Sequence, residues 1–488
     1  MNTPNRDLAS RPLHPLMTRR EILQRSGFGV GSLAFSYLAA SEARAAEATP
    51  RKGYDLTPKP PHFSASAKSV IVLMQNGGPS QMDLFDRKPA LDRHHGTVHE
   101  ERVEMFQKGS EKNQLLRTPF QFRHYGRSGM ELSEVIPHLG SVADDYTLVR
   151  SMHTGHNNHT EALVMMSTGK IFPGRPVLGS WVSYGLGTMN ENLPAYVVLR
   201  DPDGYNTSGT LLWQNAWLPA LYRGTEFSTR GAAVLNLEPS SPVSPAVRRA
   251  NLDLLAKLNE EHRRAYSLES ELEARIQNYE LAARMQLAAG KVFDMETESA
   301  ATQQLYGLDN KVTRGYGLRC LMARRLVESG VRFVQVLPPV KPQFQPWDAH
   351  GNVLTQNEQI CAQCDQPSAA LITDLKNRGL LDDTIVLWTG EFGRLPVSQN
   401  GKGRDHNRNA FSLIVAGGGF RAGHIHGATD DVGYRAVEDR VSVADLHATI
   451  LHQLGLNHDA LTFKHHGRPE TLTDSPVTNA RVVHELLV

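Results

Sequence analysis

The chain has 488 residues, of which 40% are hydrophobic and 21% are charged, and its formal net charge is +1. This composition is that of a globular protein with ample material for a hydrophobic core. Nucleic acids and anionic membranes normally bind a strongly basic face, so the near-neutral charge removes the usual electrostatic reason to expect either as a partner.

Residues 1–45 are predicted to be an export signal and not part of the fold. Arg19 and Arg20 stand side by side before a mildly apolar, glycine-rich stretch (27–40), and the run ARA (43–45) suits a signal peptidase. The run TRREIL (18–23) resembles the twin-arginine export motif, which implies a periplasmic or secreted protein that is exported already folded. A chance arginine pair before a short membrane anchor is the alternative. No other stretch approaches the roughly 20 apolar residues of a membrane span, so we expect no stable span in the mature protein.

The mature chain alternates short apolar runs with helical patterns, which predicts an α/β fold with a largely parallel central sheet and helices on both faces. The predicted strands are 68–75, 145–151, 195–200, 331–338, 383–390 and 411–418, and the clearest helical patterns are 247–288, 310–330, 357–378 and 443–456. We expect a linker at 46–67 and one domain at 68–488, with an irregular insertion at about 201–245 and a helical segment at 247–300.

Residues that suit metal binding and acid–base chemistry follow the predicted strands. Ligands of an open α/β sheet bind outside the carboxyl ends of its strands, and this rule selects Asn76 to Asp83 after the first strand, His153 to Thr160 after the second, and Glu391 after the fifth. The loop before the sixth strand adds Asp405 and His406.

Asp348 and His350 follow the fourth predicted strand, two residues apart. In an extended segment residues i and i+2 face the same side, so both can face one ion, with an oxygen and a nitrogen that suit zinc or manganese. Calcium and magnesium are alternatives. A capping acid beside a surface histidine is the structural alternative for this pair, and the convergence with Glu391, Asp405 and His406 favours the metal site.

Several motifs together resemble a known superfamily. The motifs are GGPSQMDLFDRKP (77–89), HNNHTEALVMMSTG (156–169), WDAHGN (347–352), LLDDTIVLWTGEFGRLP (380–396), GRDHN (403–407) and RVSVADLHATILHQLGL (440–456). The chain resembles the alkaline phosphatase and sulfatase superfamily, and more closely a branch of twin-arginine-exported bacterial proteins filed as a domain of unknown function. The resemblance implies an alkaline-phosphatase-like fold and a site built around divalent metal ions.

The resemblance also implies roles for individual residues. The acidic metal ligand after the first strand matches Asn76, a departure for which Asp83 could substitute. One metal position matches Asp348, His350 and His406, with Asp405 beside it. The second matches Glu391, but the histidine that usually follows is replaced by Phe392, which puts two-metal phosphoryl transfer in doubt.

The helix that follows the second strand is expected to carry the nucleophile. Thr160 is a hydroxyl at a helix N-terminus, where the helix dipole favours negative charge, and a simple helix-capping role is its alternative. His159 is expected to be either a ligand or the nucleophile. His156 and Asn158, in the same cluster, are expected to contact substrate. The Cys-x-Pro-x-Arg signature of formylglycine sulfatases is absent.

Three cations could bind an anionic group of a substrate. Arg394 is predicted to bind substrate and to assist catalysis, and Arg404 to bind substrate, while Lys402 is better explained as a solvated loop charge. Cys361 and Cys364 have redox or metal spacing within a helical pattern, and an inert buried pair or an incidental disulfide explains them better.

The leading hypothesis is an exported metal-dependent hydrolase acting on an anionic phosphate or sulfate ester. The alternative is a catalytically inactive relative that binds an anionic glycan or another ligand through the same cleft. A structural surface protein without a metal is a third possibility.

Overall fold

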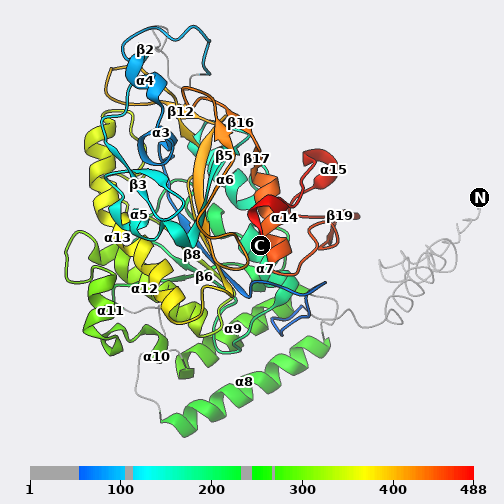
Figure 1. The fold of residues 1–488 in the computed structure, drawn as a ribbon. Helices are drawn as coiled ribbons and strands as arrows, with labels where there is room; N and C mark the ends of the chain where they lie inside the picture. The colour runs from blue at the N-terminus through cyan, green and yellow to red at the C-terminus, as the bar shows by residue number, and fades with distance from the viewer. Residues whose placement is uncertain (1–53, 105–113, 232–243, 266–269, 289) are drawn as a thin grey trace, which may run out of the picture. The chain divides into compact units, whose positions relative to one another are not determined.

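A computed structural model describes residues 54–104, 114–231, 244–265, 270–288 and 290–488 (Figure 1). The predicted export signal (1–45) and residues 46–53 of the predicted linker lie outside these residues. The described chain, from Tyr54 onward, belongs to one compact unit. None of its helices combines the length and apolar character that crossing a bilayer requires.

A nine-stranded sheet forms the centre of this unit, with the order β14-β5-β13-β9-β1-β8-β6-β7 and with β17 paired to β5. All of its strands run parallel except β13, which is antiparallel to both neighbours. The predicted fold class is therefore confirmed. The strands of the sheet are β1 (Ser69–Met74), β5 (Tyr146–His153), β6 (Tyr196–Leu199), β7 (Thr225–Phe227), β8 (Phe333–Val336), β9 (Thr384–Thr389), β13 (Phe411–Ala416), β14 (His424–His426) and β17 (Val441–Ser442).

Helices cover both faces of the sheet, as Figure 1 shows for α12 and α13 on one side and α7 and α14 on the other. The described α-helices are α3 (Gln81–Leu84), α4 (Pro89–Arg93), α5 (Pro137–Ser141), α6 (His159–Thr168), α7 (Leu178–Leu186), α8 (Pro245–Ala265), α9 (Ser270–Ala288), α10 (Gly290–Phe293), α11 (Ala300–Leu305), α12 (Arg314–Glu328), α13 (Val353–Asn377), α14 (Val443–Gln453) and α15 (Ser475–Thr478). Each long helical pattern predicted from the sequence thus corresponds to one or two of these helices.

The two faces of the sheet bury separate hydrophobic clusters, because successive side chains of a strand point to opposite faces. Along β1, Ile71 and Leu73 pack in the cluster that contains the buried side chains of α12 and α13. Val70, Val72 and Met74 pack in the cluster that contains those of α7 and α14. A strand buried on both faces explains why the predicted strands read as continuous apolar runs.

Short two-stranded ribbons surround the main sheet. They are built by β2 (Gln114–Leu115) with β11 (Val397–Ser398), β3 (Phe122–Tyr125) with β4 (Met130–Ser133), β10 (Gly393–Arg394) with β12 (His406–Asn407), β15 (Ala428–Thr429) with β16 (Ala436–Glu438), and β18 (Phe463–His465) with β19 (Arg468–Glu470). The β10–β12 ribbon matters for function, because it holds two segments that follow β9 and precede β13.

The antiparallel direction of β13 brings the loop before it to the same edge as the carboxyl ends of the parallel strands. Residues after β1, β5, β8 and β9 therefore meet residues that precede β13. The reversed direction of β13 was not predicted from the sequence.

The predicted irregular insertion at 201–245 contains more regular structure than expected. Its described part contains two 3₁₀ turns, η3 (Gly209–Trp213) and η4 (Ala220–Tyr222), and strand β7, which extends the sheet beside β6. A three-residue strand with the sequence TEF carries too short a pattern for detection from the sequence alone.

Candidate metal centre

Four side chains from three separate segments converge at the carboxyl edge of the sheet. Oδ1 of Asp348 lies 3.1 Å from Nε2 of His350, 3.2 Å from Nε2 of His406 and 3.4 Å from Nε2 of His159. His159 begins α6 after β5, Asp348 and His350 lie between β8 and α13, and His406 lies in β12. The structure therefore brings together four residues that the sequence analysis had selected at three different strand ends.

The separations of these donor atoms suit one small cation. With zinc–nitrogen bonds of about 2.0–2.1 Å, neighbouring ligand atoms of a tetrahedral ion would lie about 3.3 Å apart. Nε2 of His350 and Nε2 of His406 are 2.8 Å apart. Two imidazole lone pairs at this distance repel each other unless a proton or a cation lies between them. The donor set, three nitrogens and one carboxylate oxygen, suits zinc and other first-row transition metals better than calcium or magnesium.

Hydrogen bonds at the opposite ring nitrogens orient two of the imidazoles. Nδ1–H of His159 donates to Oε1 of Glu391 at 2.7 Å, and Nδ1–H of His406 donates to the carbonyl of Asn157 at 2.7 Å. Each Nε2 is then left as a lone-pair donor, which is how metal-binding histidines are usually held. Nε2 of His159 is buried and has no hydrogen-bond partner, which fits a ligand atom. The third ring, His350, has its Nδ1 3.8 Å from Asp405.

The electrostatics of the cluster keep its acid charged. Burial opposes the charge on Asp348, but the guanidinium of Arg394 and the nearby imidazoles outweigh it and hold the pKa of Asp348 below its usual range. Burial lowers the pKa of His406, which keeps this ring neutral near pH 7. Burial alone would lower the pKa of His159 too, yet the neighbouring carboxylates of Asp348 and Glu391 outweigh burial and raise it, so metal binding competes with protonation of this ring.

The cluster is open to solvent on one side. The side chains of Asp348 and His350 are 24% and 19% exposed, whereas those of His406 and His159 are 1% and 8% exposed. A ligand could therefore approach from the side of Asp348 and His350.

Glu391, predicted as a ligand, lies behind His159 and has two other partners. Its carboxylate is fully buried and accepts hydrogen bonds from the backbone N–H groups of Gly77 and Gly78 in addition to that from His159. Gly77 has a φ of +117°, and a Cβ there would lie 2.6 Å from the backbone nitrogen of Asp348, so only glycine fits between the two strand ends. Glu391 thus fixes His159 from the side away from the other ligands.

We expect the substitution Glu391→Gln to weaken metal binding about 10- to 100-fold, because a neutral amide holds the His159 ring less firmly than a carboxylate does. The affinity for zinc can be measured by competition with a chromophoric chelator. Glu104→Gln, which removes an exposed partner of Arg408, is the matched control and should leave the affinity unchanged. An unchanged affinity in Glu391→Gln would show that the His159–Glu391 contact does not support the metal.

Asp83 and Arg404 form a fully buried ion pair. Nε and Nη2 of Arg404 donate to the two carboxylate oxygens of Asp83 at 2.7 and 3.0 Å, and Ser80 donates a further hydrogen bond to Asp83. Arg404 also donates to the carbonyls of Leu116, Leu395 and Pro396. Every contact of the two side chains is internal, so the structure places neither of them at the mouth of the cluster.

The remaining predicted residues lie around the cluster. Thr160 follows His159 in the first turn of α6 and is exposed, and Asn158 is the residue before this helix. Nδ1 of His156 accepts a hydrogen bond from the backbone N–H of Asn158. The amide of Asn76 is fully buried with neither polar atom paired. Oδ1 of Asp405 accepts from the backbone N–H of His406.

Two groups that orient or pack against the imidazoles of the cluster were not predicted from the sequence. The carbonyl of Asn157 orients His406, and the ring of Phe392 packs against both His159 and His406, with centroid distances of 4.8 and 4.6 Å. Asn157 lies within the predicted HNNHT cluster, but a backbone carbonyl has no sequence signature. In the sequence, Phe392 indicates only the loss of a histidine.

Cys361 and Cys364 are buried free thiols in α13, and burial raises the pKa of both. This environment is that of unreactive cysteines.

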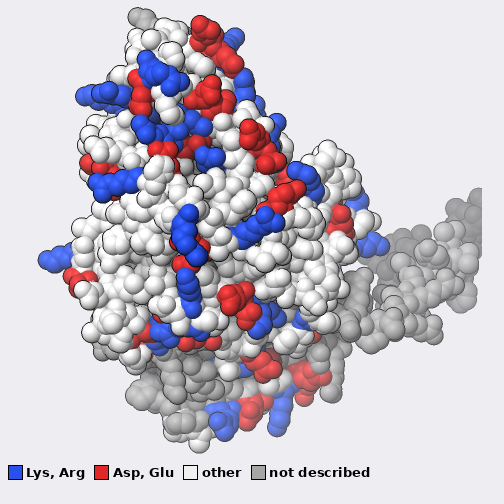
Figure 2. Space-filling view, viewed as in Figure 1, with Lys and Arg blue, Asp and Glu red and all other residues white. Residues whose placement is uncertain are grey.

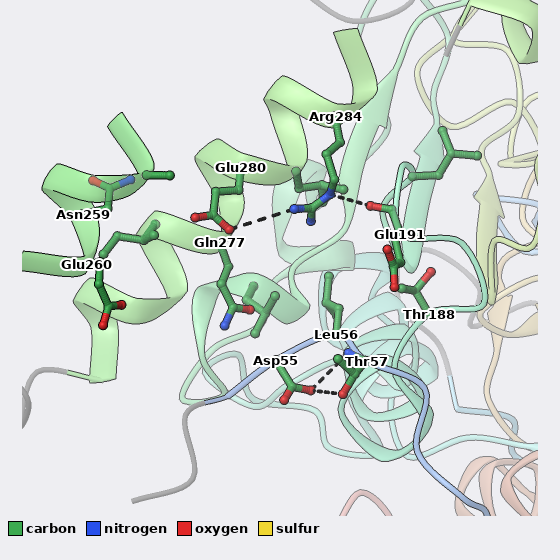
Figure 3. A pocket seen from close by; sticks show the side chains of 15 residues that line it. Asp55, Leu56, Thr57, Thr188, Glu191, Asn259, Glu260, Gln277, Glu280 and Arg284 are labelled. Atoms are coloured by element: carbon green, nitrogen blue, oxygen red, sulfur yellow. Dashed lines mark hydrogen bonds and ion pairs between the residues drawn. The ribbon is translucent and has the colours of Figure 1, made fainter. Parts of the chain in front are cut away.

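A separate cavity of about 400 Å³ lies near the amino end of β6, away from the cluster (Figure 3). Asp55, Glu191, Glu260 and Glu280 line it, and Glu280 lies 3.9 Å from Arg284.

Figure 2 shows acidic and basic side chains interspersed over the face in view, with no broad area of one sign.

Comparisons with known proteins give a family and a set of similar folds. A family model described as "Protein of unknown function (DUF1501)" matches residues 67–487. A comparison with curated proteins found no match.

Three of the solved structures that this chain is similar to are named with their scores. They are the phosphonate monoester hydrolase SpPMH from Silicibacter pomeroyi (TM-score 0.35, 13% identity, 86% of this chain and 76% of that chain), a protein in the alkaline phosphatase superfamily from Vibrio parahaemolyticus (0.35, 11%, 83% and 70%) and the PsFucS1 sulfatase from Pseudoalteromonas sp. (0.33, 13%, 86% and 71%). At these scores the activities of these proteins are not transferred to this chain.

Proposed function

The chain belongs to the DUF1501 family, whose description gives no function, and we propose that it is an exported metal-dependent hydrolase of phosphate or sulfate esters. One observation carries the proposal: three imidazole Nε2 atoms and the Oδ1 atom of Asp348 converge at a solvent-accessible point. Export through the twin-arginine pathway is part of the proposal and rests on residues 18–45.

His159, Asp348, His350 and His406 would hold the ion, and zinc or manganese fits their donor atoms. A bound divalent metal supplies a Lewis acid that polarises an ester oxygen and lowers the pKa of a hydroxyl nucleophile. Glu391 and the carbonyl of Asn157 keep two of the rings in the tautomer that binds metal. Phe392, fully buried against two of the rings, excludes water from that side of the cluster.

Thr160 remains our candidate for the nucleophile, because it is the exposed hydroxyl next to His159 and lies in the first turn of α6. The partial positive charge at a helix N-terminus stabilises a developing alkoxide there. We expect Thr160→Val to lower kcat for 4-nitrophenyl phosphate or 4-nitrophenyl sulfate by at least about 100-fold. Thr160→Ser, which keeps the hydroxyl, should retain most of the activity. If Thr160→Val keeps wild-type kcat, the nucleophile is water and not this residue.

The direct test of the function is hydrolysis of the two nitrophenyl esters by the mature protein loaded with zinc or manganese. Turnover that disappears in Asp348→Asn would support a hydrolase. Loss of the ion in this variant without any turnover in the metal-loaded wild type would reject catalysis on these esters.

A ligand-binding protein without catalysis is the second candidate, and the departures from a two-metal ligand set at Asn76 and Phe392 favour it. Isothermal titration with a sulfated oligosaccharide would detect such a binder, and binding that persists in Asp348→Asn would distinguish it from a metal-dependent enzyme.

A further inference from the structure

Arg394 lies immediately behind the proposed ligand Asp348. Its side chain is fully buried, and its Nη2 donates to Oδ1 of Asp348 at 2.7 Å. In the β10–β12 ribbon its backbone is paired directly with that of His406. The guanidinium is therefore held in register with one ligand and in contact with another.

The N–H groups of Arg394 donate hydrogen bonds to internal acceptors. Nε donates to the carbonyl of Gly78 at 2.9 Å, Nη1 to that of Arg404 at 3.1 Å, and Nη2 to that of Gly77 as well as to Asp348. An arginine stays charged at any accessible pH. Arg394 is thus a permanent cation that cannot turn outward to meet a substrate without losing these bonds.

The neighbouring carboxylates, those of Glu391 and Asp83, already accept hydrogen bonds and so offer few ligand oxygens to a second ion on this side of Asp348. Both oxygens of Glu391 accept hydrogen bonds from the Gly77–Gly78 backbone, and Oε1 also accepts from His159. Both oxygens of Asp83 accept from Arg404. The ring of Phe392 packs against His159 and His406 and lies 5.8 Å from Cζ of Arg394. An apolar ring and a guanidinium therefore border the cluster here.

We propose that Arg394 is a positioning residue that orients the carboxylate of Asp348 and restricts the centre to one metal ion. A second divalent cation on the Arg394 side of Asp348 would have to share Oδ1 of Asp348 with a guanidinium 2.7 Å away, where the repulsion between the two positive charges opposes binding. A second cation held by His350, Asp405 and His406 would have to share two imidazoles with the first ion. Oδ1 would instead bind one ion on the side of the imidazoles. The guanidinium of Arg394, behind Asp348, would compensate part of the negative charge of the carboxylate. This inference deepens the proposed function and rests on the same metal centre.

Metal stoichiometry in the mature wild-type protein tests the restriction without reference to activity. Zinc is titrated into the metal-free protein and the bound ions are counted by native mass spectrometry. We expect saturation at one ion per chain. Two ions held by the cluster, absent in Asp348→Asn, would overturn the inference and leave a hydrolase possible. One ion without ester hydrolysis would reject the proposed function and leave the inference standing, whereas a protein that binds no ion would reject both.

The substitution Arg394→Lys tests the positioning role while keeping a buried positive charge. A lysine has no planar fork, so we expect it to hold Asp348 less firmly and to lower zinc affinity about 10- to 100-fold. The visible absorption spectrum of the cobalt-substituted protein should also change, because it reports the geometry of the ligands. Arg404→Lys is the matched control, since Arg404 is equally buried but pairs with Asp83, and it should keep the wild-type spectrum.

Wild-type affinity and an unchanged cobalt spectrum in Arg394→Lys would overturn the positioning role. If Arg394→Lys does not fold, Asp348→Glu moves the carboxylate relative to the same guanidinium. This second variant should show the same loss of affinity and the same spectral change, and a wild-type spectrum there would equally contradict the inference.

Discussion

Replacing Asp348 by alanine is expected to abolish metal binding, because Oδ1 of this residue lies within 3.4 Å of all three imidazole Nε2 atoms. The loss should be visible as the absence of zinc or manganese in the purified protein by inductively coupled plasma mass spectrometry. Esterase activity, where the wild type has it, should fall to background with the metal.

Asp348→Ala also leaves the guanidinium of Arg394 buried without its charged partner, so reduced stability could be mistaken for loss of a ligand. Asp348→Asn separates the two effects, because its amide oxygen still accepts a hydrogen bond from Arg394 but is a weaker metal ligand. Asp383→Ala is the matched control, since Asp383 is 46% exposed and pairs with Lys68. A folded Asp348→Asn variant with its full metal content would reject the centre described above.

The substitution Asp83→Ala is expected to destabilise the protein by about 3–5 kcal/mol, because it leaves Arg404 charged and unpaired in a fully buried position. Urea unfolding followed by circular dichroism measures the change. Metal content should persist in the fraction that remains folded, since both oxygens of Asp83 are directed at Arg404.

The double variant Asp83→Leu/Arg404→Met provides the control for this prediction. It removes both charges together, so we expect it to recover most of the lost stability. If Asp83→Ala instead loses its metal while its unfolding free energy is unchanged, Asp83 is a metal ligand, as the family resemblance had suggested.

Patterns within single segments accounted for the main elements of the fold. The six apolar runs correspond to β1, β5, β6, β8, β9 and β13, because a strand buried on both faces must be apolar along its whole length. Strand β7 and the direction of β13 were not predicted. Strand β7 has only three residues, too few for a recognisable pattern. The direction of β13 depends on its partners in the sheet and not on its own residues.

The acids and histidines at 348, 350 and 406 could be assigned to strand ends from local patterns, since they follow or precede apolar runs that can be recognised one at a time. Which of these side chains meet at one point, and which charged side chains are enclosed, depends on how the folded segments are placed. His159 reaches Asp348 across 189 positions of the chain, as the difference between their numbers shows, and Arg394 and Arg404 are committed to buried partners. The physical reason is that a charged side chain looks the same in the sequence whether it faces solvent or a buried carboxylate, and its desolvation is set by segments that only the folded sheet brings together.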